Sequence, residues 1–335
     1  MKYKEFGSFK RKIKFCNELF VRSEKFSFAW YRFKWNYFPI LNIVSNFPLH
    51  IDIEVTDACN LRCIMCVHGS GKKIKTGFID TNFAKSIIRQ SAEGGASSIK
   101  LNWRGEPALY KELPDLISYA KQNGIQEVQI NTNGLPFTED SIHKIIDSGL
   151  DRIIFSVDGN SKETYEKIRV GGDFKKLTEN IESFIKIRKE LNRVKPFIRV
   201  QMVRMKDNNH ECNGFYKTWE NKVDDIRISD VTDRGQGDYL CVGDQVAVGR
   251  RKCPQPWQRM VVNREGRVLP CCSDWYCKQV IGDAKKDSLK TIWKGTKMRE
   301  FRNNVSEKRL DEFEPCKSCF VKESYIWKYK RSKNS

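Results

Sequence analysis

Hydrophobic and polar residues alternate along this chain in segments of two kinds. Short segments with an apolar residue at every second position, typical of half-buried strands, recur from residue 50 onward; residues 50–56, for example, read HIDIEVT. Longer segments with apolar residues three and four positions apart, typical of amphipathic helices, lie between them. This regular alternation predicts an α/β fold with a parallel sheet.

Six strands and four longer helices are predicted within residues 50–228. The strands are expected at residues 50–56, 98–103, 128–134, 152–159, 198–203 and 225–228. The helices are expected at residues 81–93, 113–123, 142–148 and 174–191. Asp80 is a plausible N-cap of the first helix, and Gly124 and Gly149 follow the second and third, where a helix commonly ends.

Three cysteines follow the first predicted strand. Cys59, Cys63 and Cys66 are separated by three and by two residues, so all three sulfurs can turn toward one small object. Thiolates suit zinc or iron–sulfur centres, and an iron–sulfur cube normally takes four of them. The triplet therefore predicts a cluster with one open metal corner; the alternatives are a zinc site or three buried thiols.

A second group of cysteines lies near the C-terminal end. A hairpin is predicted between residues 261–262 and 267–269, turning near Gly266, and residues 289–301 are expected to be helical. Cys253 precedes this hairpin, Cys271 follows it, and Cys316 and Cys319 are separated by two residues. Four thiolates can complete a closed tetrahedral site, which fits zinc and an iron–sulfur cube about equally.

Composition limits the class of protein and its partners. A length of 335 residues predicts two domains at about 150 residues each. The 61 Lys and Arg residues exceed the 42 Asp and Glu residues and give a formal charge of +19, which favours phosphates, nucleic acid or an acidic membrane surface as partners. No signal peptide is recognised and no apolar run reaches the roughly 18 residues that span a bilayer, so we expect a cytoplasmic protein with reduced thiols.

The stretch TDACNLRCIMC resembles the signature of the radical S-adenosylmethionine (SAM) enzymes. The resemblance implies a partial (β/α)6 TIM-like barrel in which the open iron of a [4Fe–4S] cluster binds the amino and carboxylate groups of SAM. In that family the cluster cleaves SAM to a 5′-deoxyadenosyl radical, which abstracts a hydrogen atom from the substrate. Met65 holds the position before the third cysteine, where the family usually has an aromatic residue near the adenine.

Further positions match the SAM-binding parts of this family. Gly105, Glu106 and Pro107 end the second predicted strand and are similar to the family's Gly-Gly-Glu motif, whose backbone accepts hydrogen bonds from the methionine ammonium. Asn133, Ser156 and Asp158 follow the third and fourth strands and are candidates for contacts with SAM or substrate. The alternative for these three is that they are polar residues that only form turns.

The second group of cysteines resembles the SPASM type of C-terminal extension. The match includes Gly266-x4-Cys271, the CC-x-D-W run and the late Cys-x2-Cys, and the number of cysteines fits the shortened, one-cluster version called a twitch domain. This implies a β-hairpin and a helix around a second [4Fe–4S] cluster held by Cys253, Cys271, Cys316 and Cys319, with a spacing similar to that of an aminocyclitol dehydrogenase of this group. Cys272, Cys277 and Cys241 lie outside both sets and are either inert or hydrogen-atom donors, as in related epimerases. Cys272 or Cys277 as a replacement for one of the four cluster ligands is a further alternative.

Residues 1–45 differ from the rest of the chain. They contain ten Lys and Arg residues, three Glu residues and many aromatic residues. A basic aromatic helix can lie on an anionic membrane, or bind a phosphate-bearing substrate or RNA. The alternative is a helical cap whose aromatic residues pack on the barrel.

Five segments are predicted from these features. They are a basic aromatic extension (1–45), a radical SAM partial barrel (46–231), a linker (232–250), a SPASM/twitch domain (251–325) and a basic tail (326–335).

The predicted function is that of a radical SAM oxidoreductase. Since all four ligands of the second cluster are thiols, that cluster is expected to accept an electron, and the substrate is expected to be an alcohol of a sugar, nucleotide sugar or aminocyclitol. The alternatives are carbohydrate epimerisation, peptide modification (RiPP maturation), RNA modification and a non-enzymatic metal protein. Expected partners are a reductant such as flavodoxin or ferredoxin, an anionic small molecule and a membrane surface contacted by residues 1–45, while nucleic acid stays open.

Overall fold

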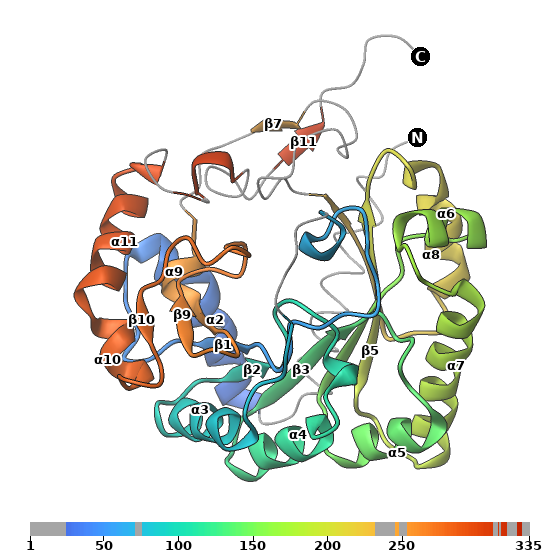
Figure 1. Cartoon of the computed structure of the whole chain (residues 1–335), viewed down its shortest axis with the longest axis horizontal. Helices are drawn as coiled ribbons and strands as arrows, with labels where there is room; N and C mark the ends of the chain where they lie inside the picture. Colours follow the sequence, from blue (N-terminus) through green and yellow to red (C-terminus); the bar gives the residue numbers. More distant parts are fainter. Residues whose placement is uncertain are drawn as a thin grey trace.

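A nine-stranded sheet organises the fold. The computed structural model describes residues 25–70, 76–231, 245–247, 253–310, 314, 316–319 and 327–329. The strand order is β10-β9-β8-β1-β2-β3-β4-β5-β6, and the six strands from β1 to β6 are parallel neighbours in chain order. They are β1 (His50–Ile53), β2 (Ser98–Lys100), β3 (Glu127–Thr132), β4 (Arg152–Ser156), β5 (Phe197–Arg204) and β6 (Asp225–Asp230). Their curved arrangement in Figure 1 confirms the predicted partial barrel.

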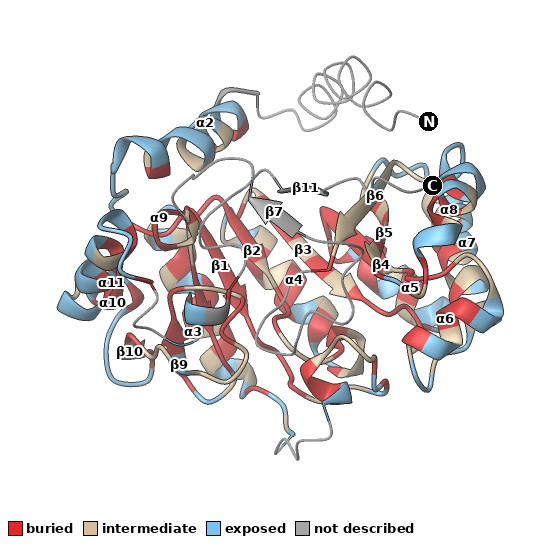
Figure 2. Cartoon of the chain, turned by 90° about the horizontal axis from the view of Figure 1, so that it is seen from above, coloured by how far each residue is buried: buried red, intermediate tan, exposed pale blue. Residues whose placement is uncertain are grey.

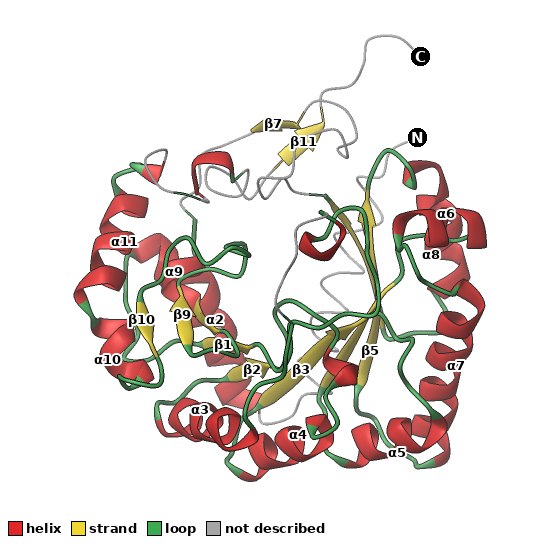
Figure 3. Ribbon diagram, viewed as in Figure 1, coloured by secondary structure: helices red, strands yellow, loops and turns green. Residues whose placement is uncertain are grey.

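Helices cover the outer face of this sheet (Figure 3). They are α3 (Thr81–Glu93), α4 (Leu113–Gln122), α5 (Glu139–Asp147), α6 (Lys162–Ile168), α7 (Phe174–Glu190) and α8 (Cys212–Trp219). The Asp80 side chain accepts a hydrogen bond from the Phe83 amide and starts α3 as predicted. Helix α5 begins three residues earlier than predicted, because a capping box between Thr138 and Ser141 fixes its polar first turn.

Two short helices were missing from the sequence prediction. Helix α6 has only 7 residues and α8 only 8, so neither gives a long periodic signal. In α8, however, Cys212, Phe215 and Trp219 are buried at spacings of three and four residues, and this pattern is visible in the sequence. The 3-10 segments are η1 (Val67–Gly69), η2 (Pro107–Leu109), η3 (Asn209–Glu211) and η6 (Cys316–Ser318).

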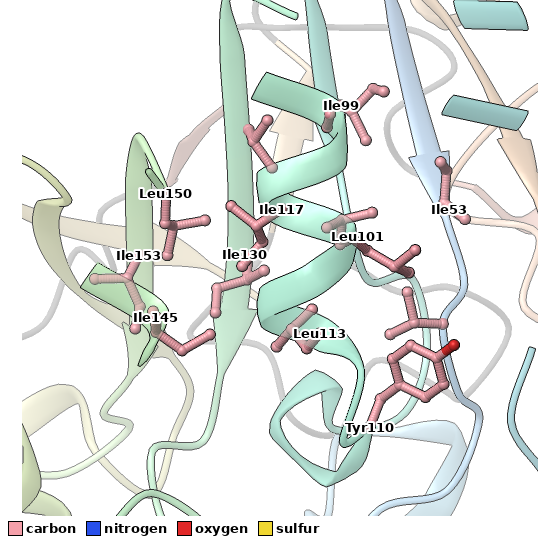
Figure 4. Close-up of a cluster of buried hydrophobic side chains, with 14 of the residues drawn as sticks. Ile53, Ile99, Leu101, Tyr110, Leu113, Ile117, Ile130, Ile145, Leu150 and Ile153 are labelled. Atoms are coloured by element: carbon pink, nitrogen blue, oxygen red, sulfur yellow. The ribbon is translucent and has the colours of Figure 1, made fainter. Parts of the chain in front are cut away.

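The main hydrophobic core lies between the sheet and its helices. Figure 4 shows Ile99 and Ile130 from the strands near Leu113 and Ile117 of α4, and Ile153 of β4 beside Ile145 of α5; all of these residues are buried. Figure 2 shows the same division over the chain, with buried strands inside and exposed outer helix faces. This core fixes the strand ends that carry the site.

The C-terminal hairpin extends the barrel sheet. It comprises β8 (Arg259–Val262) and β9 (Arg267–Leu269), with the short β10 (Gly282–Asp283) beside β9. The hairpin itself was predicted, but β8 also pairs in parallel with β1, from His50 opposite Arg259 to Ile53 opposite Val262. All four residues of β1 are buried, and pairing on both edges satisfies its backbone groups.

Helices follow and precede this hairpin. Helix α9 (Gln255–Gln258) leads into β8, and α10 (Leu289–Lys294) and α11 (Thr296–Ser306) come after β10. A single helix was predicted over residues 289–301, but Gly295 separates two helices with an extended backbone (φ −67°, ψ 164°). The prediction therefore found the helical region and missed its break.

Two strands lie in segments predicted as linker and tail. β7 (Gln245–Ala247) and β11 (Trp327–Tyr329) pair antiparallel in a separate two-stranded sheet. Cys241 lies outside the described residues. None of the helices in the described ranges combines the length and the apolar character needed to cross a bilayer.

Helix α2 (Lys25–Leu41) packs at the starts of β1, β2 and β8. Its Phe28 and Tyr31 are buried with Leu49, and the Tyr31 hydroxyl lies 3.3 Å from the Ser98 hydroxyl at the start of β2. The Gln258 side-chain amide donates to the backbone oxygen of Trp35 at 2.7 Å. This face of α2 therefore packs as the cap that we considered for residues 1–45.

Candidate active site

A cavity of about 360 Å³ lies at the C-terminal ends of the barrel strands. Cys59, Cys63 and Cys66 line it together, from the loop that leaves β1. The Thr56 hydroxyl donates to the Gly77 oxygen at 2.7 Å, and the Gly77 amide donates to Asp57 at the same distance, which holds the start of this loop. The structure thus places the predicted triplet in one cavity where a barrel of this kind has its active site.

The surroundings of the three sulfurs fit thiolate ligands. The Leu61 amide donates to the Cys59 sulfur at 3.5 Å, and Arg169 Nη1 donates to the Cys63 sulfur at 3.7 Å. Burial raises the pKa of the Cys59 thiol to about 12, so without a bound metal this thiol is neutral. Bound iron would displace the thiol proton. The Leu61 amide would then stabilise the negative charge on the Cys59 sulfur, and Arg169 that on the Cys63 sulfur. These residues fit a [4Fe–4S] cluster with three protein ligands.

Arg169 reaches this site through contacts between two loops. The amides of Arg62 and Ile64 donate to the backbone oxygens of Val170 and Ile168 at 2.9 and 3.0 Å, which lays the turn after α6 against the cysteine loop. Sequence reasoning missed Arg169, because its position depends on this pairing of loops that lie about a hundred residues apart.

Asp158 holds the Arg169 guanidinium in place. The Asp158 side chain is fully buried, accepts from Arg169 Nη2 at 2.6 Å and accepts from the Val203 amide at 2.7 Å. Burial works against the charge of Arg169, but the ion pair with Asp158 prevails and raises the arginine pKa. Asp158 does not line the cavity, so we infer that it acts by positioning Arg169.

Replacing Arg169 with Gln is expected to lower the free energy of unfolding by about 3–5 kcal/mol, because the change leaves the buried Asp158 carboxylate without its cation. Urea unfolding of metal-free protein measures this loss. Lys167→Gln is the matched control: it breaks the exposed ion pair with Asp207 and should cost about 1 kcal/mol at most. Equal losses in both variants would contradict the role assigned to Arg169.

Gly105 and Glu106 line the cavity at the end of β2. Gly105 has φ +62°, and a Cβ there would lie 2.5 Å from the Thr56 oxygen and 2.7 Å from the Ala58 oxygen, so only glycine fits. The Glu106 carboxylate accepts from the Thr132 hydroxyl at 2.6 Å and from the Asn133 amide at 2.7 Å. Burial raises the pKa of Glu106 although these hydrogen bonds oppose the shift. Its side chain thus ties the loops after β2 and β3 together, and its backbone amide donates to the Ala58 oxygen at 2.8 Å in the cysteine loop.

The other predicted cofactor contacts divide into two groups. Met65, Asn133 and Ser156 line the cavity, whereas Pro107 starts η2 and does not. The Asn133 amide nitrogen donates to the Asn60 side chain at 2.8 Å, which links the loop after β3 to the cysteine loop.

Cys253, Cys271, Cys316 and Cys319 line a second, smaller cavity of about 40 Å³. Apolar residues including Phe301, Val305 and Leu310 form much of the remaining wall. Four thiols around one cavity are the number that an iron–sulfur cube normally takes, and they also match a closed tetrahedral zinc site.

Two consecutive cysteines face different cavities. Cys271 lines the second cavity, and Cys272 lines the first one together with Cys59, Cys63 and Cys66. The loop that carries them is held to the loop after β2, since the Trp103 indole donates to the Cys272 oxygen at 2.8 Å. Cys277 lines neither cavity and packs beside Trp103.

Charged side chains fill the inner face of the barrel. Asp52 is fully buried and accepts from Lys100 Nζ at 2.7 Å and from Arg259 Nη1 at 3.1 Å. Arg104 binds the buried Glu54 carboxylate through two nitrogens, at 2.7 and 3.0 Å. Lys100 and Arg104 line the first cavity, yet sequence reasoning did not select them. The polar residues of the HIDIEVT segment suggested a strand with one side in solvent. In the structure Asp52 and Glu54 are instead buried among the charged side chains inside the barrel.

Comparisons with known proteins agree with this geometry. The sequence profile of the Radical SAM superfamily matches residues 53–197, and that of an iron–sulfur cluster-binding domain named SPASM matches residues 253–320. A probable GTP 3′,8-cyclase of Methanococcus maripaludis is 34% identical over 136 residues, which is 40% of this chain and 45% of that relative. A GTP 3′,8-cyclase of Clostridium botulinum is 27% identical over 195 residues, or 57% of this chain and 59% of the relative. The chain thus spans about half the length of the curated relatives it matches.

Solved structures share the fold. BtrN in complex with AdoMet and 2-DOIA is 20% identical, with a TM-score of 0.56, and the match covers 83% of this chain and 94% of BtrN. SuiB of Streptococcus suis bound to S-adenosylmethionine is 16% identical, with a TM-score of 0.65 and coverage of 83% and 72%. The sequence profiles imply [4Fe–4S] clusters, and these neighbours bind SAM. The chain therefore belongs to the radical SAM superfamily and carries a C-terminal SPASM-type iron–sulfur cluster-binding domain.

Proposed function

We propose that this radical SAM enzyme oxidises an alcohol carbon of a sugar, nucleotide sugar or aminocyclitol to a ketone. When bound, the first cluster and SAM supply a 5′-deoxyadenosyl radical that takes a hydrogen atom, and the auxiliary cluster supplies a one-electron acceptor. The observation that carries the proposal is the placement of adjacent residues: Cys272 faces the first cavity and Cys271 the second. The chain thus connects the two sites through one peptide bond.

Oxidation of a hydroxylated carbon removes one hydrogen atom, one proton and one electron. The hydrogen atom ends on 5′-deoxyadenosine, the hydroxyl proton passes to water or a basic side chain, and the electron leaves toward the second site. With all four thiols around that site, the protein leaves no iron open for the substrate, which supports outer-sphere electron acceptance. The atoms and electrons of the step therefore balance.

The lining of the first cavity suits a hydroxylated, polar substrate. Away from the cysteines it carries amide and hydroxyl groups, namely Asn102, Asn131, Gln201, Ser156 and Ser229. These groups can both donate and accept hydrogen bonds, which sugar hydroxyls require. The formal charge of +19 favours a substrate that carries phosphate. The similar GTP 3′,8-cyclases are named for such a nucleotide.

Epimerisation is the second candidate, and the position of Cys272 favours it. A thiol that lines the radical cavity can return a hydrogen atom to the substrate carbon from the opposite face. The product would then be an isomer of the substrate, and the new hydrogen would come from water because a thiol exchanges its proton.

Product analysis in deuterium oxide separates the two candidates. Sugars, nucleotide sugars and aminocyclitols are each tested for whether they raise the release of 5′-deoxyadenosine above the amount formed without substrate. The products of those that do are examined by mass spectrometry. Oxidation gives a product with two hydrogens fewer and no deuterium on carbon, and Cys272→Ala keeps this product.

Cys277→Ala is the matched control, since Cys277 belongs to the same domain and lines neither cavity. An isomeric product with one carbon-bound deuterium, lost in Cys272→Ala and kept in Cys277→Ala, would replace oxidation by epimerisation.

A further inference from the structure

Helix α2 carries two apolar faces, and the fold uses only one of them. Phe28 and Tyr31 are buried against the barrel and Trp35 is partly buried, at spacings of three and four residues. A second row at Trp30, Phe33, Tyr37, Ile40 and Leu41 points outward, with between 42% and 62% of each residue exposed. Figure 2 shows the long exposed flank of α2 beside the barrel. We call the second row, together with the exposed Ile43 and Val44, the outer face.

The outer face presents ordered aromatic rings to solvent. The rings of Trp30 and Phe33 stack with centroids 5.2 Å apart, and those of Phe33 and Tyr37 stack at 4.8 Å. Monomeric soluble proteins rarely expose a contiguous apolar patch of this kind without an interaction that covers it. Trp and Tyr are also the residues that prefer the boundary between water and a bilayer, since each ring has a polar handle.

The helices near the outer face are basic. Helix α2 contains Lys25, Arg32 and Lys34 and no acidic residue. Helices α10 and α11 contain five Lys and Arg against one Glu. The positive charge of these helices favours an anionic partner for this apolar face.

A basic cavity of about 580 Å³ continues the outer face beyond α2. Val44 belongs to both, and the cavity is also lined by Lys294 and Arg299, which are exposed, and by Arg302. Arg302 is buried and donates to the backbone oxygens of Pro256 and Trp293 at 2.9 and 3.1 Å. No Asp or Glu is among the described residues that line this cavity. Such a pocket suits a phosphate group.

We propose that the outer face of α2 docks on the surface of an anionic lipid bilayer, with Lys294 and Arg299 binding lipid phosphates in the adjoining cavity. The aromatic rings enter the boundary between headgroups and acyl chains, while the inner face keeps α2 fixed to the barrel. An apolar face alone would fit many partners. Its continuity with a basic, carboxylate-free cavity selects an anionic membrane.

Docking in this way leaves the active site open to the aqueous phase. Helix α2 packs at the starts of β1, β2 and β8, whereas the cysteine cavity lies at the opposite, C-terminal strand ends. The membrane contact therefore localises the enzyme without covering its cavity, and the proposal does not depend on the substrate assigned above.

Vesicle co-sedimentation of the full-length protein tests the proposal. We expect binding to phosphatidylglycerol vesicles to be at least about tenfold tighter than to phosphatidylcholine vesicles at low salt, and to weaken at about 0.5 M salt. The triple change Trp30→Ser, Phe33→Ser and Tyr37→Ser should weaken binding at least about tenfold.

A matched apolar control is Val194→Ser with Tyr216→Ser, which removes exposed hydrophobic residues elsewhere and should leave binding unchanged. For charge, Lys294→Gln with Arg299→Gln should weaken binding more than Lys176→Gln with Lys189→Gln, an equal loss of charge on α7. Circular dichroism and SAM cleavage verify that each variant is folded.

Three outcomes would overturn the proposal. They are equal binding to both vesicle types, unchanged binding of the Trp30, Phe33 and Tyr37 variant, and failure of the wild-type chain to bind at all. Sedimentation velocity would assign the outer face to a second copy if the same variant dissociates a dimer. An RNA-binding assay would assign it to nucleic acid if that variant loses RNA binding while no vesicle binding exists.

Discussion

Replacing Cys59, Cys63 and Cys66 together with Ala is expected to remove about half of the bound iron and to abolish SAM cleavage. The reconstituted wild-type chain should hold about eight irons, four in each cluster. The three thiols line one cavity, so their loss removes the whole first site, while the four thiols of the second cavity are untouched. Iron analysis and the yield of 5′-deoxyadenosine under reduction measure the two effects.

Cys212→Ala serves as the control for this experiment, because Cys212 is a buried thiol of α8 that lines neither cavity. It should keep all of the iron and all of the cleavage. Wild-type iron content of about four together with one stoichiometric zinc would show that the second site is not an iron–sulfur cluster. Residual SAM cleavage in the triple variant would contradict the assignment of the first site.

The sequence predicted which cysteines lie together, because most of their spacings are short. Cys59, Cys63 and Cys66 are close in the chain and follow a strand, and the ends of parallel strands meet at one edge of a barrel. The second group required only that a hairpin and a late Cys-x2-Cys converge, and the structure does bring Cys253 and Cys271 to Cys316 and Cys319. The positions of the cysteines and the short spacings between them were therefore enough to predict which thiols lie together.

The features that were missed depend on contacts between distant segments. Arg169 faces Cys63 only because residues 168–170 lie along the cysteine loop, and nothing in its own neighbourhood marks it. The pairing of β8 with β1 joins residues more than two hundred positions apart. Similarly, aromatic residues in α2 suggested either a cap or a membrane helix, but only the structure shows that their two rows point in different directions.

Cys271 and Cys272 are adjacent in the chain but line different cavities. Cys272 lies in a turn after β9, so strand alternation does not account for this placement. The sequence alone could not identify which cavity each of the two thiols would line. The structure identifies both cavities, and the proposal of electron transfer between them rests on that placement.

Cys316→Ala is expected to cut ketone formation at least about tenfold while SAM cleavage at the first cavity survives. Cys316 belongs to η6 and lines only the second cavity, so its loss damages the electron acceptor and leaves the cysteine triplet intact. The substrate radical would then lack an acceptor, and 5′-deoxyadenosine would form without a matching amount of ketone. Parallel quantification of both products gives the coupling ratio that decides the result.

Two further variants keep this experiment decisive. Cys277→Ala removes a thiol of the same domain that lines neither cavity, and it should keep the wild-type coupling ratio. Cys316→Ser conserves the size of the side chain, so a low coupling ratio in both Cys316 variants reports lost ligation and not lost packing around Phe301 and Val305. If both Cys316 variants still form ketone in step with 5′-deoxyadenosine, the electron does not leave through the second site. The oxidation mechanism proposed above would then fail, even though the radical chemistry of the first cavity would stand.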